Sequence, residues 1–341
     1  MYNWSAQVLP SLLAVGLALA VSAAVIWLTG SSPAVAFAAL VEGAFGSGDS
    51  LAEVSVKACP LVFTGLAVAL SFRAGIWNIG AEGQLLVGAL TLAATAQFVG
   101  STLPKPLALA LGLSAAAGGG ALWAAVAALL KLRRGVNEVI ATIMLNFIAL
   151  ALVSYLVQGP LMERGGQYPQ TEVLPPEFLL PRWAPYRLHV GLLLALLAAL
   201  VTHFALFRTR HGFELRAAGL STATARLAGI AVERRLFWAF VFSGALAGLA
   251  GGVELAAITR RLYERFSPGW GYTAIAVGLL GRLSPLGVVL AALFFGALDA
   301  GSNTMQRTAG VSAVVVYIVQ GSVILFLAAF ERWREKRGQG I

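Results

Sequence analysis

Long apolar runs separated by short polar gaps are the feature that most restricts how this chain can fold. About 20 apolar residues in a helix cross the hydrocarbon core of a bilayer. Only 11% of the residues are charged, against about 25% in soluble domains. The sequence predicts an all-α polytopic membrane protein, a single transmembrane domain over residues 1–341, with about ten helices, some broken or half-length. The predicted helices are Leu9–Leu28, Val54–Leu70, Glu82–Val99, Leu107–Leu130, Val136–Val157, His189–Phe207, Leu236–Ile258, Tyr272–Gly281, Pro285–Asp299 and Val311–Phe330.

The eighth run, Tyr272–Gly281, is too short to cross a membrane. Ten helical residues rise about 15 Å, half of the roughly 30 Å hydrocarbon thickness. The run must either extend back through Phe266–Gly271 or stop partway as a half-helix. Glycine and proline also interrupt the apolar pattern in both halves of the chain, at Gly75–Gly83 and at Pro268–Pro285. Broken helices in both halves indicate a central substrate site.

The basic residues behind the net charge of +9 lie in the gaps between the runs. Lysine and arginine are retained on the cytoplasmic side of membrane proteins. A cytoplasmic N-terminus places Lys131, the arginines of Arg208–Arg235 and the basic residues after Phe330 inside. We therefore expect both termini in the cytoplasm. The arginines of residues 260–265 fall outside and weaken this topology for the last third.

Two other segments lie outside the runs. Gln158–Leu188 contains six prolines and faces outward in this topology. We expect it to form an ordered extracytoplasmic cap, with a mobile linker as the alternative. Ser32–Gly48 is too short and too rich in glycine and serine to span, and is predicted to be a loop with an interfacial helix.

The cytoplasmic loop Arg208–Arg235 reads RTRHGFELRAAGLSTATARLAGIAVERR. Phe213–Ala218 can form one or two helical turns that end at Gly219. Ser221 can cap a second short helix that runs to Leu227. Both would lie along the membrane surface with one apolar side, formed by Leu215, Leu227 and Ile230. The loop is therefore either a docking surface for a cytoplasmic protein or an interfacial turn without a partner.

Few polar side chains lie within the apolar runs, and they include Glu82, Gln84, Gln97, Glu138, Asn146, Glu254, Asp299 and Gln320. A charged side chain at the centre of a membrane helix costs about 2.5–3.5 kcal/mol, so these side chains belong at helix ends or inside the bundle. Glu82, Glu138 and Asp299 lie near predicted ends. Asn146 lies deeper, and either bonds to another helix or lines a pathway. A stripe of small residues predicts close helix packing at Gly244, Gly248 and Gly252.

Catalytic and nucleotide-binding motifs are missing from the sequence. It contains no GxxxxGK[ST] loop, no HExxH and no GxSxG. It has three histidines and one cysteine, Cys59, which excludes an intrachain disulfide and a cysteine metal cluster. We expect no catalytic residue, cofactor or metal, and predict transport. The lack of charge pairs inside the membrane argues against an ion-coupled carrier, so energy would enter through Arg208–Arg235.

Five segments together resemble one family: SFRAGIWNIGAEGQLLVGAL, GVNEVIATIMLNFIAL, ELRAAGLSTATARLAGI, FSGALAGLAGGVEL and GYTAIAVGLLGRLSPLGVVLAALFFGAL. They are similar to permease subunits of bacterial ABC importers of the branched-chain amino acid and simple-sugar group, especially its nucleoside-uptake branch, from about residue 60 to residue 330. The resemblance implies a fold similar to vitamin B12-type importer permeases and a location in the inner or plasma membrane of a bacterial cell. It also implies three kinds of partner: a second permease, two ATP-binding subunits or one tandem ATPase, and an extracytoplasmic substrate-binding lipoprotein.

The resemblance also implies roles for particular residues. The segment that couples to the ATPase would comprise Glu214, Leu215, Arg216, Ala217, Ala218, Gly219 and Arg226. The Leu-Pro pair that the family carries after the position of Ile230 is absent here. The family's RAG-NIGAEGQ segment, which maps to Arg73–Gln84, would lie near the translocation path.

Side chains at the two breaks offer hydrogen bonds and stacking that suit a neutral polar ring compound such as a nucleoside. With the deeper asparagine, the candidates for the substrate path are Trp77, Asn78, Glu82, Gln84, Asn146, Trp270 and Tyr272. The two tryptophans can instead be interfacial anchors. We expect the permease subunit of an ATP-driven importer of nucleosides or related simple sugars. The alternatives are an ion-coupled secondary transporter of small polar solutes and a non-transporting membrane scaffold or enzyme.

Overall fold

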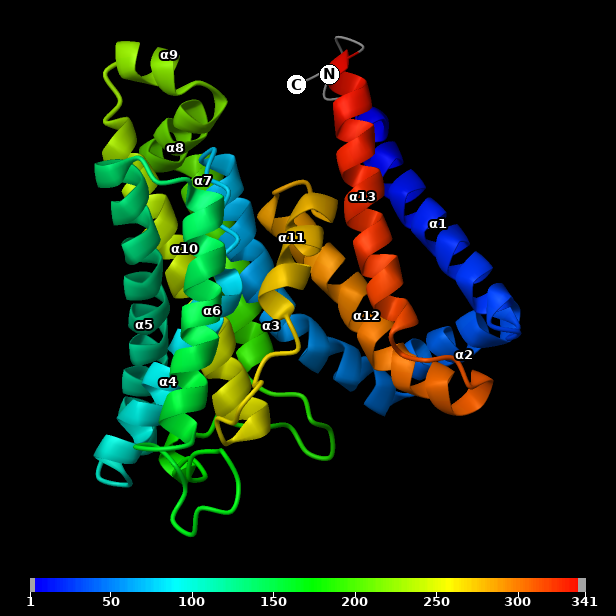
Figure 1. Ribbon diagram of the computed structural model, residues 1–341, viewed down its shortest axis with the longest axis horizontal. Coiled ribbons are helices and arrows are strands. Elements are labelled where there is room, and N and C mark those ends of the chain that lie inside the picture. Colours follow the sequence, from blue (N-terminus) through cyan, green and yellow to red (C-terminus); the bar gives the residue numbers. More distant parts are fainter. Residues whose placement is uncertain (1–3, 337–341) are drawn as a thin grey trace.

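The computed structural model describes residues 4–336 and is built of helices joined by turns and longer loops (Figure 1). The first half contains α1 (Trp4–Leu28), α2 (Pro33–Phe45), α3 (Gly48–Arg73), α4 (Ala81–Val99), α5 (Lys105–Arg134), α6 (Glu138–Val157) and the short 3₁₀ helix η1 (Pro176–Phe178). The second half contains α7 (Gly191–Arg208), α8 (Arg210–Leu220), α9 (Thr222–Leu227), α10 (Val232–Glu254), the π-helical turn η2 (Leu255–Thr259), α11 (Trp270–Leu280), α12 (Pro285–Ala309) and α13 (Val315–Lys336).

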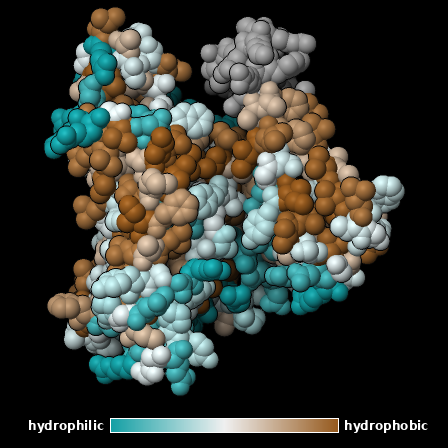
Figure 2. All heavy atoms as spheres, in the orientation of Figure 1, coloured by the Kyte–Doolittle hydropathy of each residue, from teal (hydrophilic) through white to brown (hydrophobic). Residues whose placement is uncertain are grey.

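Each of the ten predicted runs falls on a helix, which confirms an all-α polytopic membrane protein. Among the described residues, seven helices are long and apolar enough to cross a membrane: Ser11–Leu28, Gly48–Arg73, Lys105–Arg134, Glu138–Val157, Gly191–Arg208, Val232–Thr259 and Pro285–Ala309. Shorter apolar helices are Pro33–Phe45, Trp270–Leu280 and Val315–Phe330. Figure 2 shows the same pattern on the surface, with apolar flanks at mid-height and hydrophilic residues toward the lower end.

α3 lies at the centre of the fold because its side chains are buried on nearly every side. It contacts α10, α11, α12 and α7, and its largest fully buried side chains are Phe63 and Leu66. In Figure 1, α4, α5, α6 and α10 lie to one side of α3, whereas α1, α2, α12 and α13 form a second group. α11 lies between the two groups, where it contacts α3, α4, α12 and α13.

The glycine stripe of α10 lies along the face that meets α5. A Cβ added at Gly244 would overlap the Ala124 side chain, and one at Gly248 would overlap the Ala116 carbonyl oxygen. At Gly252 the added atom would lie 2.5 Å from the Ala116 Cβ. The absence of side chains at these three positions lets the α5 and α10 backbones approach within direct contact.

The segment Ser32–Gly48 and the end of α12 are more helical than the sequence predicts. The segment Ser32–Gly48 contains the 13-residue helix α2, which begins with proline at its first position and packs on α12. α12 continues to Ala309 instead of ending at Asp299, so the expectation that Asp299 lies near a helix end is wrong. Lys57 of α3 explains how this carboxylate is tolerated inside a helix, because its Nζ lies 3.2 Å from Asp299 Oδ2. Both residues belong to helices long and apolar enough to cross a membrane, so the expectation that these helices contain no charge pair is wrong.

The Gln158–Leu188 segment is joined by backbone hydrogen bonds to the chain around η2. The amide of Thr171 donates to the Leu262 carbonyl at 2.8 Å, and the amide of Leu180 donates to the Ala256 carbonyl at 3.1 Å. Phe178 of η1 is 1% exposed and fits beside Gly112 of α5, where a Cβ would lie 3.0 Å from its ring. These contacts fix the segment at the end of the bundle opposite α8 and α9 (Figure 1).

Candidate functional site

The first break in the helical pattern separates α3 from α4. α3 ends at Arg73, the backbone turns through Gly75 with a φ of 74°, and α4 begins at Ala81. Glycine is suited to this turn because other residues are strained at positive φ. The break therefore falls where the sequence predicts it, within Gly75–Gly83.

The side-chain amides of Asn78 and Gln84 pair across this break. Asn78 Nδ2 lies 3.3 Å from Gln84 Oε1, and Gln84 Nε2 lies 3.2 Å from Asn78 Oδ1. Asn78 also donates to the Ser243 hydroxyl of α10 at 3.0 Å and accepts from the Gly80 amide at 2.9 Å. Both amides are 1% exposed, so in this conformation they hold the broken segment to α10. Sequence reasoning did not single out Ser243.

Asn146 of α6 joins the same break to the second half of the chain. Its Oδ1 accepts from the Gly83 amide at 2.8 Å, and its Nδ2 donates to the Ile79 carbonyl at 2.9 Å and to the Tyr272 hydroxyl at 3.3 Å. The residue is fully buried. Asn146 therefore connects α6, the start of α4 and α11 through one side chain.

Glu82 lies at the start of α11, although it belongs to α4. One carboxylate oxygen accepts a 2.7 Å hydrogen bond from the Gly271 amide, and the residue is 2% exposed. The Ser267 hydroxyl accepts from the Gly269 and Trp270 amides at 3.1 and 3.2 Å. The first amides of a helix have no partner within the helix and attract negative charge. Glu82 and Ser267 together satisfy them here.

α11 has 11 residues, so its length is about 16 Å at 1.5 Å per residue. The short apolar run therefore stops partway as a half-helix instead of extending back through Phe266. Its N-terminus meets the first break at Glu82, and its Tyr272 meets Asn146. The two breaks, which are far apart in the sequence, therefore lie in direct contact in the fold.

The three aromatic candidates differ in their positions. Tyr272 is 39% exposed beside the hydrogen-bonded network. Trp77 is 54% exposed and its ring lies 4.7 Å from that of Phe72, outside the network. The backbone amide of Trp270 donates to the Ser267 hydroxyl. Its ring packs edge-on against the Phe266 ring, with the two ring centres 6.3 Å apart.

α8 and α9 form the tip of the molecule seen at upper left in Figure 1. The Ser221 hydroxyl accepts from the Thr224 amide at 3.2 Å and caps α9, as the sequence predicts. α8 is longer than expected and ends at Leu220, so Gly219 does not terminate it. Gly219 instead lies against the end of α3, because a Cβ there would overlap the Arg73 carbonyl oxygen.

The apolar residues of this tip are not gathered on one buried side. Leu215 and Ile230 pack against a buried cluster. Leu227, which the sequence placed beside them, is 91% exposed. Two residues that sequence reasoning did not single out, Phe213 and Leu220, are also exposed, at 61% and 81%. An exposed apolar surface of this kind is typical of a docking site.

Glu214 fixes α8 to α10. Arg210 donates to one carboxylate oxygen at 2.7 Å and Arg235 donates to the other at 2.6 Å. Hydrogen bonds from Arg210 and Arg235 hold the pKa of Glu214 below its ordinary value. Of the other coupling candidates, Ala218 is buried, Leu215, Arg216, Ala217 and Gly219 are half-buried, and Arg226 pairs with Glu233 at 2.6 Å.

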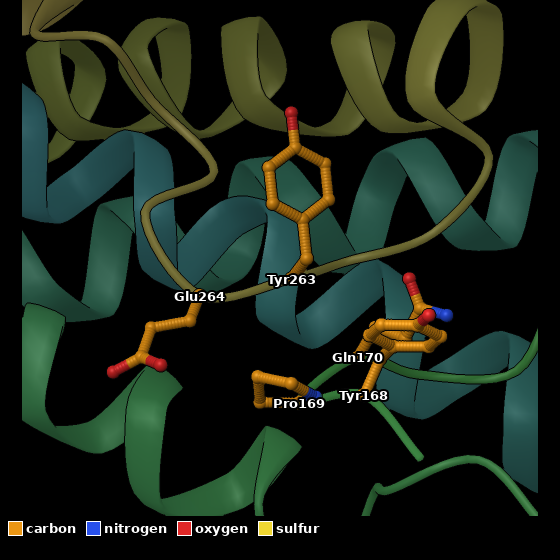
Figure 3. A pocket seen from close by; sticks show the side chains of 5 residues that line it. All are labelled: Tyr168, Pro169, Gln170, Tyr263 and Glu264. Atoms are coloured by element: carbon orange, nitrogen blue, oxygen red, sulfur yellow. The ribbon is translucent and has the colours of Figure 1, made fainter.

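An open pocket of about 460 Å³ lies at the opposite end of the bundle, between the Gln158–Leu188 segment and the chain after η2. Figure 3 shows its lining, with the Tyr263 ring projecting toward the helices and away from the other side chains. The lining residues are Tyr168, Pro169, Gln170, Tyr263 and Glu264. None of them belongs to the network at the two breaks.

Comparison with known proteins gives a consistent result. The family described as "Branched-chain amino acid transport system / permease component" matches residues 50–328. The glucose ABC transporter permease protein of Haloferax volcanii is 39% identical over 94% of this chain and 87% of its own length. The guanosine ABC transporter permease protein NupP of Bacillus subtilis is 38% identical over 95% and 93%. NupQ, a second guanosine permease protein of that organism, is 29% identical over 71% and 77%. No solved structure matches the chain significantly.

Proposed function

Because the chain belongs to the permease family of ABC importers described as the branched-chain amino acid transport system permease component, we propose that it forms the path by which nucleosides or related simple sugars cross the membrane. The chain is a multi-pass permease subunit, and ATP hydrolysis belongs to separate subunits of such transporters. One relative is named for glucose and another for guanosine, which supports this substrate range.

The observation that carries the proposal is the meeting of the two breaks. Neutral amides of Asn78, Gln84 and Asn146 and the partly exposed Tyr272 gather there, and the buried carboxyl group of Glu82 is already engaged by the start of α11. Neutral donors and acceptors beside an aromatic ring suit an uncharged polar ring compound. A rearrangement that opens this network would expose these groups to a passing substrate.

The tip formed by α8 and α9 is the proposed docking surface for an ATP-binding subunit. Its exposed apolar side chains are Phe213, Leu220 and Leu227. Glu214 connects α8 to α10 by accepting hydrogen bonds from Arg210 and from Arg235 of α10. The start of α1 and the end of α13 lie at the same end of the molecule (Figure 1). With the tip in the cytoplasm, the start of α1 and the end of α13 lie on the cytoplasmic side as well, which agrees with the excess of basic residues in Arg208–Arg235.

The proposed assembly contains a second permease, two ATP-binding subunits or one tandem ATPase, and an extracytoplasmic substrate-binding lipoprotein. The two guanosine permease proteins of Bacillus subtilis that resemble this chain support a pair of permeases. The lipoprotein would deliver its substrate at the end that carries the Gln158–Leu188 segment, opposite the ATPases.

Reconstituted vesicles test the proposal directly. The chain, its partner permease, its ATPase and its binding protein are incorporated, and uptake of radiolabelled guanosine and glucose is followed in parallel. We expect one of the two to accumulate only when ATP reaches the ATPase. Accumulation driven by a proton gradient without ATP would instead identify an ion-coupled carrier.

A further inference from the structure

Arg73, the last residue of α3, links several elements at the end of the bundle next to α8. Its Nε donates to the Leu283 carbonyl at 2.6 Å, and its Nη2 donates to the Arg282 carbonyl at 3.4 Å. The guanidinium carbon lies 5.0 Å from the centre of the Phe207 ring of α7, and Arg216 of α8 lies at the same distance from that ring. One side chain thus contacts both α7 and the turn that follows α11.

The turn held by Arg73 is conformationally unusual. Arg282 and Leu283 have φ values of 55° and 52°, in the left-handed region that residues with a side chain rarely adopt. Such conformations persist where the surroundings fix them, and they cluster in switch regions and at functional sites. The turn ends α11 and leads into α12 at Pro285. Arg73 supplies a fixing contact by donating to both carbonyls.

The backbone beside Arg73 touches α8 without any side chain in between. A Cβ at Gly219 would overlap the Arg73 carbonyl oxygen, and one at Gly75 would lie 3.2 Å from the Gly219 Cα. Two glycines therefore bring the last turn of α8 onto the start of the first break. A shift of α8 cannot be absorbed by flexible side chains at this contact.

The same segment also holds the other end of α11. Glu82 accepts from the Gly271 amide in the first turn of α11, while Arg73 donates to the turn after its last residue. Residues 73–82 therefore form hydrogen bonds at both ends of the half-helix α11. α8 contacts this segment directly at Gly219.

We infer that Arg73 is the positioning residue through which a movement of α8 and α9 reaches the half-helix α11, and through it the network where the two breaks meet. This inference rests on the proposed function, because it requires an ATPase that moves α8 and α9. It adds a specific route, from Gly219 through Arg73 to the turn at Arg282 and Leu283.

The test compares Arg73→Gln with Arg73→Lys in the reconstituted complex. We expect Arg73→Gln to keep ATPase copurification and basal ATP hydrolysis within about twofold of wild type. ATP-driven uptake of the probe that wild type accumulates, guanosine or glucose, should fall at least tenfold. Lysine keeps the charge but lacks the planar fork of donors, so Arg73→Lys should be intermediate. Arg133→Gln, at an exposed position in the last turn of α5, is the matched control and should behave as wild type.

A spin-label measurement of the turn before α12 distinguishes two explanations for lost uptake. Either the movement of α8 no longer reaches α11, or Arg73 only stabilises the fold. Leu286 is 54% exposed in the first turn of α12, and the one native cysteine, Cys59, is buried, so a spin label at Leu286→Cys reports this turn selectively. ATP should change the label's mobility in the wild-type background and leave it unchanged with Arg73→Gln. A normal ATP response in Arg73→Gln, or normal uptake, would overturn the inference. Failure of the wild-type complex to use ATP for uptake would instead count against the proposed function.

Discussion

The Glu82 carboxylate accepts a 2.7 Å hydrogen bond from the Gly271 amide, 189 residues further along the chain. This contact ties the start of α4 to the start of the half-helix α11 and places a buried carboxylate at a helix N-terminus, where negative charge is favoured. It makes the two breaks interdependent, because neither helix start can move without losing the bond or carrying the other with it.

Replacing Glu82 should therefore destabilise the fold and slow transport together. Glu82→Gln keeps an acceptor but removes the charge, which weakens the bond by about 1 kcal/mol. Glu82→Ala leaves the Gly271 amide without this partner and should cost about 1–3 kcal/mol. We expect a lower thermal unfolding midpoint in detergent and reduced uptake, in the order Ala below Gln below wild type. Glu42→Gln, at an exposed position in α2, should change neither quantity. An Ala variant as stable as wild type would contradict this role.

A side chain at Gly248 should prevent α10 from packing. A Cβ there would overlap the Ala116 carbonyl oxygen and lie 3.0 Å from the Gly120 Cα, and backbone atoms cannot move aside as a flexible side chain can. We expect Gly248→Leu to lower the free energy of unfolding by about 1–3 kcal/mol or more, since that is the usual cost of overpacking. Gly118→Ala in α5 is the control, since nothing lies within 4 Å of its added Cβ. It should be neutral or stabilising by up to about 1 kcal/mol. Thermal midpoints and the yield of monodisperse protein measure both.

The positions of the helices could be predicted from the sequence because lipid leaves the backbone few alternatives. Each apolar run is a helix, and the length of Tyr272–Gly281 was enough to suggest a half-helix. Helix ends were harder to predict. The polar residues after Asp299 mark the end of the apolar run, but α12 continues because Lys57 pairs with Asp299 and because Ser302 and Met305 are buried.

The sequence could predict which residues belong to the candidate site, but it could not predict which of them contact one another. Glycine and proline patterns mark the two breaks, but no local pattern shows that Glu82 bonds to Gly271 or that Asn146 bonds to Tyr272. The four-residue spacing of Arg210 and Glu214 suggests an ion pair, whereas the contribution of Arg235 depends on the tertiary fold. From the sequence, Gly219 is expected to end a helix. In the structure, α8 continues past it, and Gly219 instead contacts the backbone at the end of α3.

A larger residue at Gly219 should uncouple hydrolysis from transport. The added side chain must push α8 away from the Arg73 carbonyl oxygen, which it would otherwise overlap. We expect Gly219→Val to leave the complex in the membrane with bound ATPase and to lower substrate-stimulated hydrolysis and uptake several-fold. Ala223→Val, on the exposed surface of α9, adds the same kind of side chain without this contact and should have little effect. Normal stimulation in Gly219→Val would argue against the contact being part of the coupling.

His189, just before α7, should make stability depend on pH. Burial, together with the positive charges of Arg182 and Arg187, lowers the pKa of His189 to about 4. The pKa of an unfolded histidine is about 6.5. Between these values the unfolded chain binds a proton that the folded chain does not, so this group's contribution to stability is complete above about pH 6.5 and declines as the pH falls toward 4. The loss can reach about 3 kcal/mol below pH 4.

The variant His189→Phe isolates this effect from other groups that titrate in the same range. Phenylalanine keeps an aromatic ring but cannot bind a proton, and neither nitrogen of His189 has a hydrogen-bond partner among the described residues, so the exchange removes no hydrogen bond of the ring. We expect the variant to be at least as stable as wild type near pH 7, because two unsatisfied buried polar atoms are removed. Its thermal midpoint should fall less than that of wild type between pH 6.5 and 4. His211→Gln, at an exposed position in α8, should retain the full wild-type slope. Equal slopes for wild type and His189→Phe would mean that the buried ring is not the group whose protonation destabilises the fold.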